Sequence, residues 1–134
     1  MSIEHDTEEN IPVVSPLDKD FTLGNLSRMA NAGLIIGITL TVGGNIVSGN
    51  MISGKEYMES IADTLENINE QGDTLATLYR SYSSNIYDGS DESERVEFVH
   101  LKDAIIFQGT VRHQVGLWRG RINAVDGYSF GCMG

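Results

Sequence analysis

The clearest alternation of hydrophobic and polar positions lies in the stretch LIIGITLTV, at residues 34–42. Its apolar side chains fall at every second position, as in a strand with one buried face: Leu34, Ile36, Ile38, Leu40 and Val42. The GGN that follows is a turn signal, and IVSGNMI at residues 46–52 predicts the second strand of a hairpin. Gly37 and Gly49 interrupt these strands. They predict bends or bulges, which a strongly curved sheet requires.

Before this hairpin, the pattern predicts a short helix at residues 22–31, with Thr22 as its N-cap and Gly33 as its terminator. Residues 1–20 are acidic, contain two prolines and show little apolar periodicity. Such composition predicts a flexible tail. We therefore expect an acidic tail at 1–20 and a single α+β domain at 21–134.

After the hairpin, helical spacing replaces strand spacing. Ser53 and Glu56 form an S-x-x-E capping box, in which each side chain bonds the backbone N–H of the other residue. Apolar residues then recur at three- and four-residue spacing: Tyr57, Met58, Ile61, Ala62, Leu65 and Ile68. Gly72 interrupts the pattern, and a second short helix is predicted from four further residues: Leu75, Leu78, Tyr79 and Tyr82. We expect these helices to cover a sheet.

The remaining chain predicts an exposed acidic loop at 87–94 and about three further strands. One strand is expected to turn a corner at Lys102–Asp103 and continue to Phe107. The segment VGLWRGRINAV then alternates, and Asp126–Gly127 is a strong signal for a hairpin turn. This order predicts an α+β fold with an N-terminal helix and a helical insert. The sheet is expected to be either a curved antiparallel sheet or a small Sm-like or SH3-like barrel.

Charge and composition restrict the classes of partner. The net charge of −10 disfavours non-specific binding to nucleic acid or to anionic lipid. No apolar run is long enough for a membrane span, and the first residues do not form a secretory signal. The single cysteine, Cys132, fits a reducing compartment. We expect a cytoplasmic protein without a membrane partner.

One short motif suggests a nucleotide-binding enzyme. Residues 49–55 read G-x-x-x-x-G-K, as in a phosphate-binding loop. Such a loop needs a hydroxyl after the lysine to bind Mg²⁺, whereas Glu56 follows Lys55 and would place a carboxylate near the phosphates. The residues from Asn50 to Ser53 also continue a strand. We interpret the match as coincidental.

No catalytic set emerges elsewhere. The three histidines and the cysteine lack metal-ligand spacing: His5, His100, His113 and Cys132. No G-x-S-x-G nucleophile elbow is present. His100 lies in a predicted strand, where a buried, hydrogen-bonded imidazole is the ordinary interpretation. The sequence therefore predicts no catalytic residue, cofactor site or metal site.

One group of residues suggests an interaction surface. Arg119 and Arg121 flank Trp118, and together these three side chains could bind an acidic group. The alternative is that the two arginines are ordinary charges on the solvent face of a strand.

Three segments resemble a known family. ITLTVGGNIVSGNMISGKEYMESIADTL at 38–65, EFVHLKDAIIF at 97–107 and LWRGRINAVDGYSFG at 117–131 are similar to the gas vesicle accessory protein U family. Its members show V-x-G-x-M-I-S-x-K-E-Y, then F-[IV]-H-L-K, then W-R-G-[RK]-I-x-x-V-D-G-[FY]-x-x-G. The blocks occur here in the same order and cover about half of the chain. The acidic tail and residues 68–95 lie outside them.

The resemblance implies a non-enzymatic accessory protein without a cofactor, associated with gas vesicles in the cytoplasm. It implies a role in vesicle assembly or clustering at the vesicle surface, with the shell or other accessory proteins as partners. Open sheet edges and the exposed ends of strands such as 34–42 could pair between copies, which would make a homo-oligomer. The runner-up hypothesis is a small-barrel binding module that recognises an acidic peptide or, less in keeping with the acidity, nucleic acid.

Overall fold

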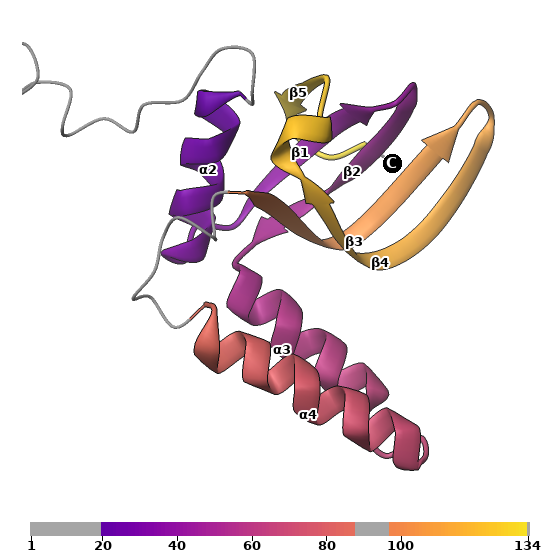
Figure 1. Cartoon of the computed structure of the whole chain (residues 1–134). Coiled ribbons are helices and arrows are strands. Elements are labelled where there is room, and N and C mark those ends of the chain that lie inside the picture. The colour runs from indigo at the N-terminus through magenta and orange to yellow at the C-terminus, as the bar shows by residue number, and fades with distance from the viewer. Residues whose placement is uncertain (1–19, 88–96, 134) are drawn as a thin grey trace, which may run out of the picture.

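The computed structural model describes residues 20–87 and 97–133 (Figure 1). The elements follow in this order: α2 (Phe21–Asn31), β1 (Ile36–Val42), β2 (Asn45–Ile52), α3 (Gly54–Leu65), α4 (Glu70–Asn85), β3 (Phe98–Gln108), β4 (Val111–Arg121), the short 3₁₀ helix η1 (Ile122–Ala124) and β5 (Gly127–Phe130). This confirms the predicted α+β class with an N-terminal helix and a helical insert. The predicted tail, apart from Asp20, and the acidic loop, apart from Tyr87, lie outside the described residues.

The five strands form one antiparallel sheet in the order β4-β3-β2-β1-β5. Strands β1 and β2 form the predicted hairpin, because Gly43 and Gly44 adopt φ values of 57° and 85° between the paired residues Val42 and Asn45. Positive φ at both central positions is the requirement of the favoured two-residue hairpin turn. The predicted alternation is confirmed, since Ile38 and Leu40 are fully buried.

The sheet bends where three strands depart from regular pairing. Asp103 has a φ of 54° and Gly116 a φ of 78°, and the register shifts between β3 and β4 at this level. On β2, a Cβ at Gly49 would lie 3.0 Å from the Lys102 carbonyl oxygen, so only glycine allows this close approach. The predicted corner and the curved sheet are therefore confirmed. The sheet is open, with β4 and β5 as its edges, and the structure does not show the alternative barrel.

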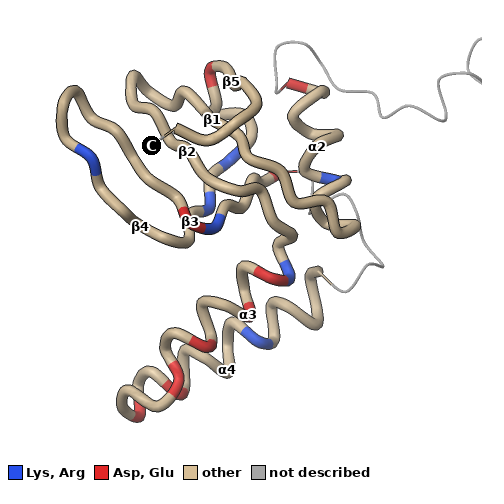
Figure 2. Tube along the Cα trace, turned by 180° about the vertical axis from the view of Figure 1, so that it is seen from behind, with Lys and Arg blue, Asp and Glu red and all other residues tan. Residues whose placement is uncertain are grey.

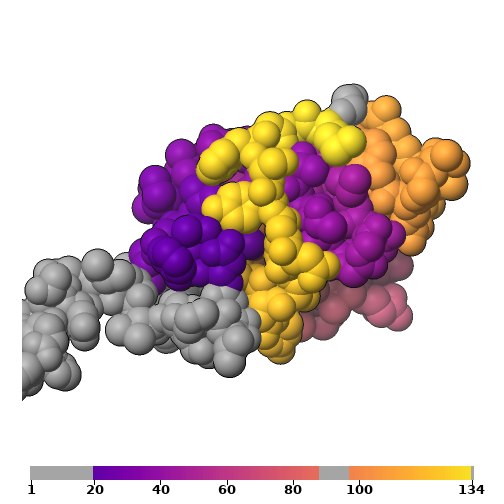
Figure 3. Space-filling view, turned by 90° about the horizontal axis from the view of Figure 1, so that it is seen from above, coloured from indigo at the N-terminus to yellow at the C-terminus, as the bar shows by residue number. Residues whose placement is uncertain are grey.

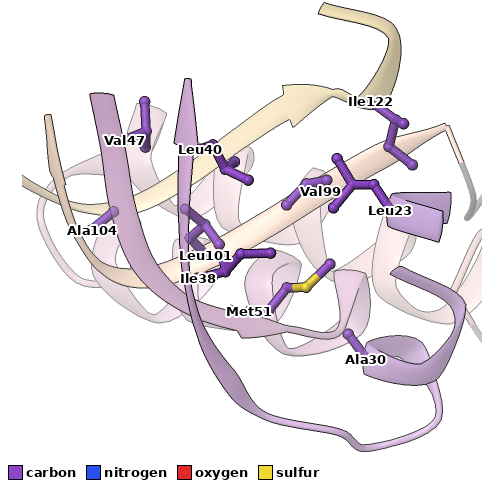
Figure 4. Close-up of a cluster of buried hydrophobic side chains, with 10 residues drawn as sticks. All are labelled: Leu23, Ala30, Ile38, Leu40, Val47, Met51, Val99, Leu101, Ala104 and Ile122. Atoms are coloured by element: carbon purple, nitrogen blue, oxygen red, sulfur yellow. The ribbon is translucent and has the colours of Figure 1, made fainter. Parts of the chain in front are cut away.

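Helix α2 packs its apolar side against the concave core of the sheet (Figure 4). The core cluster comes from α2, the strands β1, β2 and β3, and η1: Leu23, Ala30, Ile38, Leu40, Val47, Met51, Val99, Leu101, Ala104 and Ile122. The N-cap of α2 is Asp20 and not the predicted Thr22, because the Asp20 carboxylate accepts from the Thr22 backbone N–H at 3.0 Å. Gly33 follows the helix with a φ of 116°, as predicted for its terminator.

Helices α3 and α4 form an antiparallel hairpin that projects from the sheet (Figure 1), so the expectation that they cover the sheet is wrong. Helix α4 is also 16 residues long, and Gly72 lies in its first turn. A Cβ at Gly72 would clash with the carbonyl oxygen of Leu65, so this glycine permits the close approach of the two helices. The break between the two helices lies before Gly72. Glu66 is the C-cap of α3, and Asn69 is the N-cap of α4, where its side chain accepts from the Gly72 N–H at 2.7 Å.

The expectation of a hairpin turn at Asp126–Gly127 is also wrong. The Asp126 carboxylate accepts from the Gly43 N–H at 3.0 Å, and the backbone N–H of Asp126 donates to the Thr41 carbonyl at 2.8 Å. Strand β5 thereby pairs with β1 and not with β4. The chain then crosses the outer face of β2, where the Met133 N–H donates to Ser48 Oγ at 2.7 Å. Figure 3 shows this C-terminal segment, in yellow, against the purple residues of β1 and β2.

Candidate functional site

The three residues predicted as an interaction surface do not lie on one face of the sheet. Trp118 pairs with Leu101 and packs against the core cluster, and its indole lies over Gly120. Arg119 points to the opposite face, where it pairs in register with His100. Arg121 is exposed on that same face. The arrangement brings the two arginines together and separates both from the tryptophan.

Arg119 is held among aromatic side chains and is not an ordinary surface charge. Its guanidinium carbon lies 3.7 Å from the centroid of the Phe98 ring, a close cation–π contact. Nη1 donates to His100 Nε2 at 2.7 Å and to the Tyr87 hydroxyl at 2.9 Å. Arg121 lies farther from the same ring, at 5.7 Å. Arg119 therefore joins β4 to β3 and to Tyr87, two residues after the end of α4.

His100 is 2% exposed, which confirms the interpretation as a buried, hydrogen-bonded imidazole. Because an arginine can only donate, Nε2 accepts, and the neutral ring carries its proton on Nδ1. Burial, and secondarily the Arg119 charge, lower the pKa of His100 to about 3. The ring lies between Tyr57, at a centroid distance of 4.9 Å, and Tyr87, at 5.5 Å. His100 is therefore a neutral hydrogen-bond acceptor at physiological pH.

These five side chains, which we call the base cluster, attach the helical hairpin to the sheet: Tyr57, Tyr87, Phe98, His100 and Arg119. The ring of Tyr87 packs directly on Gly54, the first residue of α3, where a Cβ would clash with it. The Gly54 N–H donates to the Asn31 side chain at 2.8 Å, which connects the same point to α2. Both ends of the hairpin are thus fixed to the sheet at one place.

The strand-to-helix junction explains the apparent phosphate-binding motif. Gly49 lies in β2, and Lys55 lies in the first turn of α3 with its Nζ 3.3 Å from the Glu59 carboxylate. Ser53 Oγ accepts from the Glu56 N–H at 2.9 Å, as the capping box predicts. The second predicted hydrogen bond of the capping box, from the Ser53 backbone N–H to the Glu56 carboxylate, is wrong. The Glu56 carboxylate accepts from Lys102 Nζ at 3.3 Å, because the opposite charge of Lys102 attracts it away from the helix end.

The three sequence blocks that carry the family resemblance meet at this place. The K-E-Y block supplies Tyr57, the F-V-H-L-K block supplies Phe98 and His100, and the W-R-G block supplies Arg119. Sequence reasoning missed Tyr87, whose partners are distant along the chain and leave no local signal. It noted Arg119 but could not show that aromatic rings cover it.

Within the base cluster, one guanidinium nitrogen of Arg119 engages both the His100 ring and the Tyr87 hydroxyl. In residues 20–87 and 97–133, no three His, Cys, Asp or Glu side chains gather as metal ligands would. No helix within these ranges combines the length and apolar character that crossing a membrane requires.

The fold and this cluster define a class: an α+β protein whose open antiparallel sheet holds a projecting helical hairpin at a rigid base. A family model described as "Gas vesicle protein GvpU-like" matches residues 20–133. The chain therefore belongs to the GvpU-like gas vesicle protein family, which confirms the resemblance seen in its sequence. Comparison with curated proteins and with solved structures found no match.

Proposed function

We propose that this chain is a non-enzymatic accessory protein that acts at the surface of gas vesicles, in their assembly or their clustering. The family match over residues 20–133 carries the proposal, because it includes the sheet, the base cluster and the whole helical hairpin. Its partners are the vesicle shell or other accessory proteins, in the cytoplasm of the cell that makes the vesicles.

The geometry supports a contact role. Each of the three motif blocks contributes at least one residue to the contacts of the base cluster. Their effect is to hold the helical hairpin at a fixed orientation to the sheet. A rigid projecting arm suits a protein that contacts a large body, since little conformational entropy is lost on binding.

A flotation experiment tests the proposal. Purified protein is mixed with isolated intact gas vesicles, the vesicles are allowed to float, and the buoyant layer is assayed for the protein. We expect enrichment in that layer, and microscopy of the same layer separates clustering from binding alone. An acidic protein of similar size from another family controls for trapped liquid. Recovery of the protein entirely in the lower liquid would contradict action at the vesicle surface.

A further inference from the structure

The edge strand β4 differs in charge from the rest of the chain. Residues 104–125 contain three arginines and no acid, whereas the whole chain has a net charge of −10. All three arginines lie in β4: Arg112, Arg119 and Arg121. Figure 2 shows most of the described acids, in red, on the hairpin of α3 and α4, which projects away from the sheet. Because salt screens charges over about 8 Å, a ligand at β4 responds mainly to the positive charge of this strand.

Two of these residues, Arg119 and Arg121, form what we call the arginine pair. They lie two positions apart on one face of β4, opposite His100 and Phe98 of β3. Both guanidinium groups lie over the Phe98 ring, with their central carbons 3.7 Å and 5.7 Å from its centroid. Neither arginine forms an ion pair with an acid in the part of the chain that the structure describes. The pair is therefore an unneutralised double positive charge in a strongly acidic chain.

The arginine pair keeps hydrogen-bond donors for a ligand. Arg119 uses Nη1 for His100 and Tyr87, and its Nε and Nη2 make no hydrogen bond within the described ranges 20–87 and 97–133. A guanidinium whose face lies on an aromatic ring still presents the N–H groups of its own plane. A carboxylate can accept two such N–H groups at once. The pair is thus arranged to bind two carboxylates, one at each guanidinium.

The backbone of β4 restricts the kind of ligand further. Among the described strands, β4 pairs with β3 alone, so one of its two backbone edges has N–H and C=O groups that no strand pairs with. An extended peptide offers both acceptors and donors to such an edge. The phosphate chain of a nucleic acid offers acceptors only and would leave the C=O groups of β4 without partners. The edge therefore favours a peptide over nucleic acid.

We propose that β4 binds an acidic peptide segment of another protein as an additional strand of the sheet, with two carboxylates held by the arginine pair. Side chains directly opposite each other on neighbouring strands lie on the same face. Because Arg119 and Arg121 are two positions apart, the two carboxylates have to be two positions apart as well. The geometry thus specifies an extended segment of the form acid–x–acid.

A second copy of this chain fits the sheet edges less well. Antiparallel pairing of two β4 strands would bring their arginines together. Strand β1, which the sequence suggested as an edge, lies between β2 and β5, so its backbone groups are already paired. The other edge strand, β5, has only four residues and no charged side chain. The charges therefore select β4 as the docking edge and an acidic segment as its occupant.

This inference deepens the proposed function and rests on it for its biological meaning, because the acidic segment would belong to a shell protein or to another accessory protein. Its test uses the purified full chain and synthetic peptides without vesicles. Specific peptide binding by a protein that does not float with vesicles overturns only the vesicle role. A protein that floats with vesicles but does not distinguish the peptides below overturns only the binding at β4.

The first experiment measures peptide binding by fluorescence anisotropy. The probe is the fluorescein-labelled peptide TVEVEVT, in which the two carboxylates lie on one face of a strand. The peptide TVVEEVT has the same composition, but its adjacent carboxylates lie on opposite faces. We expect TVEVEVT to bind at least about fivefold more tightly, because only this peptide reaches both arginines from one strand. A third peptide, TVEVEVT with N-methyl groups on its central residues, keeps the carboxylates but cannot donate to β4, and it should bind more weakly.

A matched pair of variants locates the site. Arg121→Gln removes one member of the arginine pair and should weaken the binding of TVEVEVT about tenfold. Arg112→Gln removes the same charge from the same strand, but a seven-residue strand centred on Gly120 does not reach it, so binding should be unchanged. Arg121 is exposed, so the fold should be retained, and circular dichroism checks this for both variants. Hydrogen–deuterium exchange should also slow in residues 117–121 of the wild type when TVEVEVT is added.

Several results would overturn the proposed site. The absence of saturable binding of TVEVEVT, equal affinity for TVVEEVT, or equal weakening by Arg112→Gln and Arg121→Gln would each contradict the alignment of two carboxylates with the arginine pair. Equal affinity for the N-methylated peptide would show that the carboxylates bind without an added strand. Tighter binding of a labelled oligothymidylate than of TVEVEVT would identify a nucleic-acid surface instead.

Discussion

The buried imidazole of His100 should make the stability of the fold depend on pH. Its pKa is about 3 in the folded protein, against an ordinary value of 6.5 that applies when the chain is unfolded. Between these two values the unfolded chain binds a proton that the folded chain rejects. The free energy of unfolding therefore falls as the pH falls below 6.5, and this loss levels off near pH 3.

The size of the effect follows from the two pKa values. Each unit of pKa difference corresponds to about 1.4 kcal/mol between the protonation states. Relative to pH 7, His100 should reduce the free energy of unfolding by about 1 kcal/mol at pH 5.5 and by about 2 to 3 kcal/mol at pH 4.5. Such a loss is a substantial part of the roughly 5–15 kcal/mol that stabilises a typical domain.

Urea denaturation measures this loss, with the fluorescence of Trp118, the single tryptophan, reporting on unfolding. The wild type, His100→Gln and His113→Gln are compared at pH 7 and pH 4.5 at one protein concentration. Glutamine can still accept a hydrogen bond from Arg119 but does not titrate. His113 is exposed on β4, so its replacement controls for the loss of an imidazole as such.

We expect His100→Gln to be less stable than the wild type at pH 7 and to lose less stability on acidification. Carboxylates contribute equally to both proteins, so the difference between their losses isolates His100. Parallel losses in wild type and His100→Gln would refute the reasoning, because they would mean that the folded protein protonates His100 as readily as the unfolded chain does.

Three further predictions use the same denaturation assay. Gly54→Ala should destabilise the fold by about 1–3 kcal/mol, because its Cβ would clash with the Tyr87 ring; an unchanged midpoint would show that this ring can move aside. Gly24→Ala should stabilise α2 by about 0.5–1 kcal/mol, since its Cβ meets nothing within 4 Å, and a loss of stability would contradict the packing described for α2. Arg119→Lys should cost about 1–3 kcal/mol, because an ammonium cannot stack on Phe98 as a planar guanidinium does; equal stability would show that only the charge matters.

Sequence patterns correctly predicted the turns, caps and bends whose conformation depends on residues adjacent in the chain. The turn at Gly43–Gly44 and the cap at Ser53 need only a few adjacent residues, and both are confirmed. The corner at Lys102–Asp103 is confirmed as well, at a residue with positive φ. In each case the backbone conformation and its partner lie within one short segment.

Features that depend on distant segments could not be predicted in the same way. The pair Asp126–Gly127 signals a turn, but the partner of β5 is decided by the Asp126 bonds to the β1–β2 hairpin. Gly72 suggested a break because glycine disfavours a helix interior. The structure needs a glycine there, because a Cβ would clash with the Leu65 carbonyl oxygen where α4 passes the end of α3. Arg119 alternates onto the face of its strand opposite Trp118, and the aromatic rings that cover it come from two other segments, β3 and the residues after α4.

The base cluster also changes where the function of the molecule should be sought. Four of its five residues, all except Tyr87, belong to the motif blocks that carry the family resemblance, and they are engaged with one another or with Tyr87. These side chains fix the orientation of the hairpin relative to the sheet, because their contacts join segments of the hairpin and of the sheet at one place. Helix α4 lies outside those blocks and exposes two leucines, Leu75 and Leu78. Substitutions at these two exposed positions should therefore leave the base cluster intact, whereas substitutions within the cluster should change how the hairpin meets the sheet.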